Sequence, residues 1–144
     1  MTVSRNQGTE TRCKIHVSRF SYSFLENSEA EQKDMVYEIK CTNCEKVYVG
    51  ETKQKISARI RQHKNTCKNT YFGAHTALST HAQETSHKFD FDNVSCLERE
   101  GNDRKRKILE AIHITRRENT VNFKSDTENL SKVYNNLIKR FDVL

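Results

Sequence analysis

Two cysteines and two histidines have the side-chain types and the spacing of a metal site. Cys41 and Cys44 are separated by two residues, and His81 and His87 follow later in the chain. Two thiolates and two imidazoles form the closed tetrahedral shell that structural zinc prefers. The sequence therefore predicts a structural Zn²⁺ ion held by these four side chains. The alternative is a buried or redox-active cysteine pair with two surface histidines.

The composition indicates an intracellular protein, and its charge alone is weak evidence for nucleic-acid binding. The chain has 144 residues, of which 25 are Lys or Arg and 19 are Asp or Glu, and its formal net charge is +6. An excess of cations attracts phosphate backbones, although solvated helix faces have the same composition. The sequence has no secretory signal and no apolar run of membrane-spanning length, and its five cysteines are an odd number for a disulfide framework. We therefore expect a nuclear or other intracellular location and no membrane partner.

A β-hairpin is expected to carry the cysteine pair. Residues 35–40 and 47–49 are rich in β-forming side chains and flank the Cys-Thr-Asn-Cys segment. A two-residue turn at its centre would place Cys41 opposite Cys44 and Tyr37 opposite Tyr48. In that register the two cysteines and the two tyrosines share one face of the hairpin.

The remaining periodicities predict helices around one further strand. Thr52 is expected to cap a helix that ends near residue 64, with Arg59 and His63 on one face. Helices are then expected over 76–84 and 104–118, a strand from residue 88, and an amphipathic helix from residue 130 onwards. The order β-β-α-α-β-α-α predicts a small α+β domain with a three-stranded, mostly antiparallel sheet flanked by helices. Residues 1–30 are read as a flexible N-terminal arm or the remnant of an upstream domain, and residues 31–144 as the domain itself.

The ordered set of these residues resembles the GIY-YIG endonuclease superfamily. The first signature element would be Met35-Val36-Tyr37 and the second Tyr48-Val49-Gly50, and the resemblance spans about residues 35–123. Met35 stands where the family has glycine. This departure supports an alternative hypothesis, a catalytically inactive, zinc-stabilised DNA- or RNA-binding module of the same fold. A weaker alternative is a zinc-stabilised protein-interaction domain that uses the C-terminal helix.

The resemblance implies a metal-dependent DNA endonuclease that hydrolyses phosphodiester bonds and nicks one strand, with no small-molecule substrate. Tyr37 would be the general base, Arg59 would contact the scissile phosphate, and Glu110 would hold one Mg²⁺ or Mn²⁺ ion. The other expected members of the site position water, phosphate or backbone: they are Tyr48, His63 and Asn122. Basic side chains would contact DNA: these are Lys53, Lys55, Arg61, Lys64 and Arg106.

The cysteine and histidine pairs make the resemblance more specific. A cysteine pair inside the hairpin, and a histidine pair that ends at His87-Lys88-Phe89-Asp90, resemble the endonuclease domain of Penelope-like retroelements. This likeness implies a retroelement-derived nuclease whose partners are DNA and a reverse transcriptase encoded by the same element, outside these residues. Zinc would then be a structural ion, separate from the catalytic ion at Glu110.

Overall fold

The computed structural model describes residues 14–16, 32–68, 75–128, 130–131 and 134. Their core is a four-stranded sheet of order β1-β4-β2-β3, in which every neighbouring pair is antiparallel. Its strands are β1 (Lys14–His16), β2 (Met35–Lys40), β3 (Val47–Thr52) and β4 (Asn93–Arg99). The predicted α+β class is confirmed, and the short edge strand β1 lies within residues 1–30, for which the sequence predicts a flexible arm or the remnant of an upstream domain.

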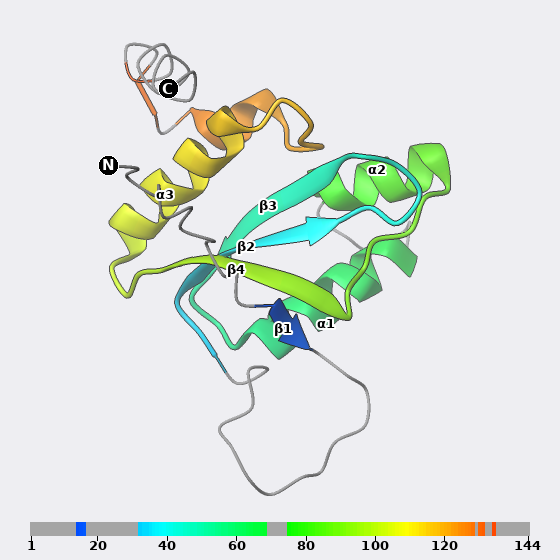
Figure 1. The fold of residues 1–144 in the computed structure, drawn as a ribbon, viewed down its shortest axis with the longest axis horizontal. Helices are drawn as coiled ribbons and strands as arrows, with labels where there is room; N and C mark the ends of the chain where they lie inside the picture. The colour runs from blue at the N-terminus through cyan, green and yellow to red at the C-terminus, as the bar shows by residue number, and fades with distance from the viewer. Residues whose placement is uncertain (1–13, 17–31, 69–74, 129, 132–133, 135–144) are drawn as a thin grey trace, which may run out of the picture.

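Helices pack on both faces of the sheet because the side chains of each strand alternate in direction. Alternate residues of β2 such as Tyr37 and Ile39 pack with α1 (Ile56–Lys68) and α2 (Ala77–Thr85). The intervening residue Val36 packs instead with Val49 and Ile114, the latter from α3 (Asp103–Arg116). Figure 1 shows α1 and α2 together behind the sheet and α3 beside β2 and β3, followed by the 3₁₀ helix η2 (Lys124–Thr127).

The hairpin between β2 and β3 corrects the predicted register. Tyr37 lies opposite Gly50, and Ile39 lies opposite Tyr48. Six residues, 41–46, separate β2 from β3, and a distant segment supplies part of their hydrogen bonding: the Thr42 N–H donates to the Lys88 carbonyl at 2.8 Å. A shift of two positions preserves the facing of every side chain. The two tyrosines therefore still share a face, with ring centroids 6.3 Å apart.

The helix boundaries also follow local hydrogen bonds. Thr52 is the last residue of β3 instead of a helix cap, and its hydroxyl accepts from the Gln54 N–H at 3.0 Å, so α1 begins at Ile56. Thr76 caps α2 in a capping box with Ser79. None of the described helices is long and apolar enough to cross a membrane. The predicted C-terminal helix lies mostly outside the described residues.

Candidate active site and metal cluster

Three hydrogen-bonded side chains, here called the tyrosine relay, connect β2 to α1 at the centre of the domain. The Arg59 Nε–H donates to the Tyr37 hydroxyl at 3.3 Å, and that hydroxyl lies 2.7 Å from Nε2 of His63. Arg59 and His63 are four residues apart in α1, so they lie on one helix face, as the sequence predicts. Tyr37 is fully buried and His63 nearly so, which isolates the middle and far end of the tyrosine relay from bulk water.

Protonation states give the tyrosine relay a direction. Burial, aided by the charge of Arg59, lowers the pKa of His63 to about 3, so its imidazole is neutral at physiological pH. Burial and then the neighbouring Tyr48 phenol raise the pKa of Tyr37 well above its ordinary value of 10, while Arg59 opposes them. Arg59 can only donate, so the Tyr37 hydroxyl accepts from it. In the His63 tautomer that carries its proton on Nδ1, the hydroxyl donates its own proton to Nε2 of His63. The hydrogen bonds therefore run from Arg59 through Tyr37 to His63.

The neutral state of His63 predicts a pH-dependent stability. Between pH 6.5 and about pH 3 the unfolded chain binds a proton at this residue that the folded chain does not. Stability should therefore fall as the pH is lowered through this window, by up to about 1.4 kcal/mol per pH unit. Urea denaturation of wild type and of His63→Gln measures this: the stability advantage of wild type should shrink toward acid pH. Parallel stability curves would contradict the assignment, since other acid-sensitive groups act equally in both proteins.

Gly50 makes room for the Tyr37 ring on the neighbouring strand. A Cβ added at Gly50 would lie 2.6 Å from the Tyr37 hydroxyl oxygen and 2.9 Å from a ring carbon of Tyr48. Real Cβ atoms do not approach other heavy atoms this closely, so both tyrosines pack over bare backbone. A glycine inside a strand is a signal of such a close approach.

Gly50→Ala is therefore expected to displace Tyr37 from Arg59 and His63. Overpacking of this kind costs about 1–3 kcal/mol of unfolding free energy, which urea denaturation measures. Gly101→Ala is the matched control, because a Cβ there meets nothing within 4 Å. Equal stability of the two variants would contradict the close packing of Tyr37 and Tyr48 over Gly50.

Glu110 brings a carboxylate to the tyrosines from α3. Burial, then the charges of Glu51 and Asp126, raise its pKa to about 8, and Arg59 acts in the opposite direction. Burial also raises the pKa of Tyr48 to about 12; Arg59 opposes this shift and Glu110 adds to it. A half-buried carboxylate among other acids gains from a bound cation, and carboxylate oxygen is the ligand that Mg²⁺ and Mn²⁺ prefer. The donor chemistry therefore fits the expected ion at Glu110.

Asn122 fastens the edge of β3 next to Tyr48. Its Oδ1 accepts from the Val49 N–H at 3.0 Å, and its Nδ2 donates to the Val49 carbonyl at 2.8 Å. The side chain thus satisfies the backbone as a neighbouring strand would. Asp126 accepts a further bond from Nδ2 at 3.2 Å and also contributes to the electrostatics of Glu110. Asn122 orients β3, the strand that carries Tyr48. It takes no part in the hydrogen bonds between Arg59, Tyr37 and His63.

Met35 occupies the first position of the signature as a core residue. It is fully buried and belongs to the apolar cluster that also contains Tyr37, Ile56 and Leu78. On the sheet it pairs with Thr52 and Arg99, at the end of β2. The departure from glycine therefore adds a packed side chain beneath the site and places no new group among its polar atoms.

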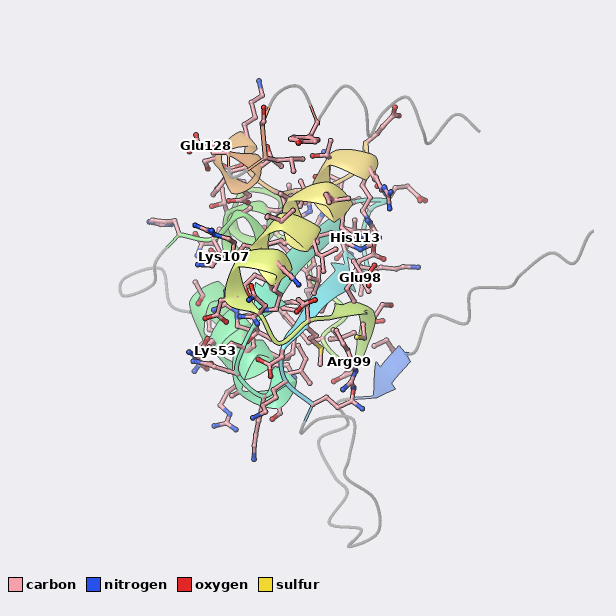
Figure 2. The ribbon with its side chains drawn as sticks, turned by 90° about the vertical axis from the view of Figure 1, so that its left-hand side faces the viewer. Lys53, Glu98, Arg99, Lys107, His113 and Glu128 are labelled. Atoms are coloured by element: carbon pink, nitrogen blue, oxygen red, sulfur yellow. The ribbon has the colours of Figure 1, made fainter. Side chains whose placement is uncertain are left out.

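The basic side chains divide into three environments. Lys53 is exposed and, with Arg59 and Lys107, lines a hollow of about 300 Å³ between β3, α1 and α3. Figure 2 shows Lys53 and Lys107 on the same side of the molecule. Lys55 is also exposed. Arg61 and Lys64 follow Arg59 by two and five residues, and at about 100° per residue they point to the far flank of α1.

Arg106 is placed differently from the expected DNA contact. It is 2% exposed, and its guanidinium meets Glu51 at 2.6 Å, Asp103 at 2.7 Å and Asp34 at 3.6 Å. A buried guanidinium with these partners is not available to phosphate. It joins α3 to β3 one helical turn before Glu110 and therefore helps to fix the position of that carboxylate. The Asp103 pair has the local i,i+3 spacing. The pairs with Glu51 and Asp34 have no local sequence signal, because these partners are far from Arg106 in the chain.

The predicted metal ligands converge at the other end of the hairpin. The ligand atoms of Cys41, Cys44, His81 and His87 all lie within 4.8 Å of one another. Each sulfur lies 3.6 Å from a histidine nitrogen, and the two nitrogens are 3.3 Å apart. A tetrahedral ion with the usual zinc bond lengths requires about 3.6 Å and about 3.3 Å for these separations. The cluster could therefore bind a metal ion that ties the hairpin loop to α2.

The tyrosine-bearing hairpin, Arg59 and Glu110 thus belong to one small α+β domain. The family model of the GIY-YIG catalytic domain matches residues 33–123, well over half of the chain, and the chain therefore belongs to this family. No curated protein and no solved structure gives a significant match. Family membership implies a metal-dependent nuclease with DNA as its substrate.

Proposed function

We propose that this chain is a Mg²⁺- or Mn²⁺-dependent endonuclease that hydrolyses one phosphodiester bond and nicks one strand of DNA. The observation that carries the proposal is the buried tyrosine relay, from Arg59 through Tyr37 to His63, beside Glu110. One such site serves one strand; a double-strand cut needs a second copy or a second event. The half-exposed flank of Arg59 opens on the hollow that also contains Lys53 and Lys107, whose charges would attract a DNA backbone.

The tyrosine relay suggests how water is activated. Tyr37 can take a proton from the attacking water at its hydroxyl oxygen while it passes its own proton to Nε2 of neutral His63. A bound phosphate would offset the Arg59 charge that lowers the pKa of His63, and so would ease this transfer. Arg59 would hold the phosphate through the guanidinium nitrogens that do not contact Tyr37. A divalent ion at Glu110 would supply stabilisation of the charge on the phosphate and on the leaving oxygen.

Plasmid nicking tests this proposal directly. Supercoiled plasmid should convert to the open circle only with Mg²⁺ or Mn²⁺ present, and Glu110→Gln should lose this activity by a factor of about 10² or more. Glu118→Gln is the matched control, because Glu118 is exposed and lies beyond the end of α3. Equal activity in both variants would exclude Glu110 as the metal ligand. Salt-sensitive DNA binding without any nicking would instead favour the inactive binding module.

The Cys/His cluster is proposed to hold zinc as a structural ion. Two thiolates suit Zn²⁺ better than Mg²⁺, and all four ligands come from the protein, which leaves no open position for catalysis. The proposed Penelope-like origin, with a reverse transcriptase of the same element as partner, rests on this cluster in its hairpin. A nick that primes reverse transcription must carry a free 3′ hydroxyl. Extension of the nicked plasmid by a DNA polymerase would support this origin, and a blocked 3′ end would exclude priming.

A further inference from the structure

A second groove lies on the flank of α1 that faces away from Arg59. It encloses about 770 Å³ between the C-terminal parts of α1 and α2 and the segment 87–92. Its lining includes three lysines, two phenylalanines and one acid: Lys64, Lys68, Lys88, Phe89, Phe91 and Asp92. None of the residues that line this groove also lines the hollow beside Arg59. It is therefore a separate surface from the nuclease site.

The outer wall of this groove is fixed to the sheet. The Lys88 N–H donates to Oδ1 of Asn43 at 2.8 Å, and the Asp90 N–H donates to the Lys40 carbonyl at 2.8 Å. Phe89 bridges to Cys41 and is buried, so it forms the floor. Because His87 also belongs to the Cys/His cluster, the wall is anchored at its start as well. The groove is thus preformed, which lowers the ordering cost of binding an occupant.

The chemistry of the lining selects an anionic occupant with flat rings. Three ammonium groups face one carboxylate among the described lining residues, and that carboxylate, Asp92, is 67% exposed and only 3.9 Å from Lys64. Phe91 is half-buried and offers part of its ring to the groove. Unpaired nucleic acid combines a phosphate backbone with ring faces that stack on aromatic side chains, whereas a duplex keeps its base faces stacked inside. We propose that this groove binds an unpaired nucleic-acid strand.

Fluorescence anisotropy of the full chain with a labelled oligothymidylate, without added Mg²⁺ or Mn²⁺, tests the proposal. Phe91→Leu keeps an apolar side chain but removes the ring, and should weaken binding on the order of tenfold. Binding weakens as salt is added, and the slope of log affinity against log salt concentration measures how many phosphates are contacted. In the double variant Lys68→Gln/Lys88→Gln this slope should become less steep by about 1.4, which is roughly 0.7 for each lost phosphate contact. The matched double variant Lys33→Gln/Lys105→Gln removes the same charge from exposed lysines that line neither this groove nor the hollow beside Arg59, and should leave the oligothymidylate affinity much less changed. An oligouridylate arm shows whether DNA or RNA is preferred.

Three results would overturn this proposal. Unchanged oligonucleotide affinity in both the Phe91 and the Lys68/Lys88 variants would remove the groove from binding. An equal loss of affinity for a blunt duplex would show a general electrostatic surface without strand selection. Binding of a polyglutamate peptide at the same residues, tighter than either oligonucleotide, would assign the groove to an acidic protein partner. Because this assay needs no cleavage, and plasmid nicking by Phe91→Leu should be unchanged, its failure is distinguishable from failure of the proposed nuclease function.

Discussion

Tyr37→Phe is expected to lower the rate of plasmid nicking by a factor of about 10²–10⁴, the range for loss of a proton-transfer group. The substitution deletes only the oxygen that lies 3.3 Å from Nε of Arg59 and 2.7 Å from Nε2 of His63. The ring itself remains to fill the core above Gly50. A large loss of rate would therefore report the chemistry of the hydroxyl and not the packing of the side chain.

The same substitution carries a modest folding cost that must be separated from its effect on rate. Loss of the hydroxyl leaves buried groups of Arg59 and His63 without their partner, which costs about 1–3 kcal/mol. Single-turnover nicking should therefore be measured well below the melting temperature of each variant. Tyr134→Phe is the matched control, because it removes a hydroxyl from a side chain that is 59% exposed. If Tyr37→Phe kept its rate within about threefold of that control, another group would have to accept the proton from water.

Features that depend on alternation and short spacing could be predicted from the sequence. The period of two in β2 places Tyr37 and Cys41 on one face whichever register the hairpin adopts. The i,i+4 spacing of Arg59 and His63 fixes their shared helix face in the same way. The convergence of the cysteine and histidine pairs was predictable from ligand type, because two thiolates and two imidazoles together make up a complete tetrahedral zinc ligand set.

Features that depend on contacts between distant segments could not be predicted. The hairpin loop is longer than expected because residue 88 supplies its hydrogen bonds, and nothing near the loop indicates this. Arg106 reads as a surface cation from its basic neighbours, yet two acids from distant parts of the chain, Asp34 and Glu51, pair with it in addition to the nearby Asp103. The strand β1 pairs with β4 from far along the sequence. In each case the local structure depends on a partner that is distant in the sequence, so the residue types alone do not predict it.

Removal of the metal is expected to unfold the domain or to lower its stability by roughly 5 kcal/mol or more, a large part of the 5–15 kcal/mol typical of a domain. The cluster is the link between the hairpin loop and α2, and without an ion two thiols and two imidazoles would be left packed against one another. The chain as purified should contain about one zinc ion, and a chelator should lower the melting temperature. Nicking should stay lost when Mg²⁺ is added back to the zinc-free chain, since the same hairpin carries Tyr37 and Tyr48.

Two comparisons make the zinc prediction specific. Cys44→Ser should reproduce the effect of the chelator, whereas Cys67→Ser should not, because Cys67 is a half-buried thiol outside the cluster. Added Zn²⁺ should restore the fold of the metal-free chain, and Mg²⁺ alone should not, because a hard cation binds thiolate poorly. Protein refolded with zinc should still not nick plasmid until Mg²⁺ or Mn²⁺ is added. This result would separate the structural ion from the catalytic one. A zinc content near zero, with a melting temperature that the chelator leaves unchanged, would remove the metal from the fold and leave the cluster as a packed set of thiols and imidazoles.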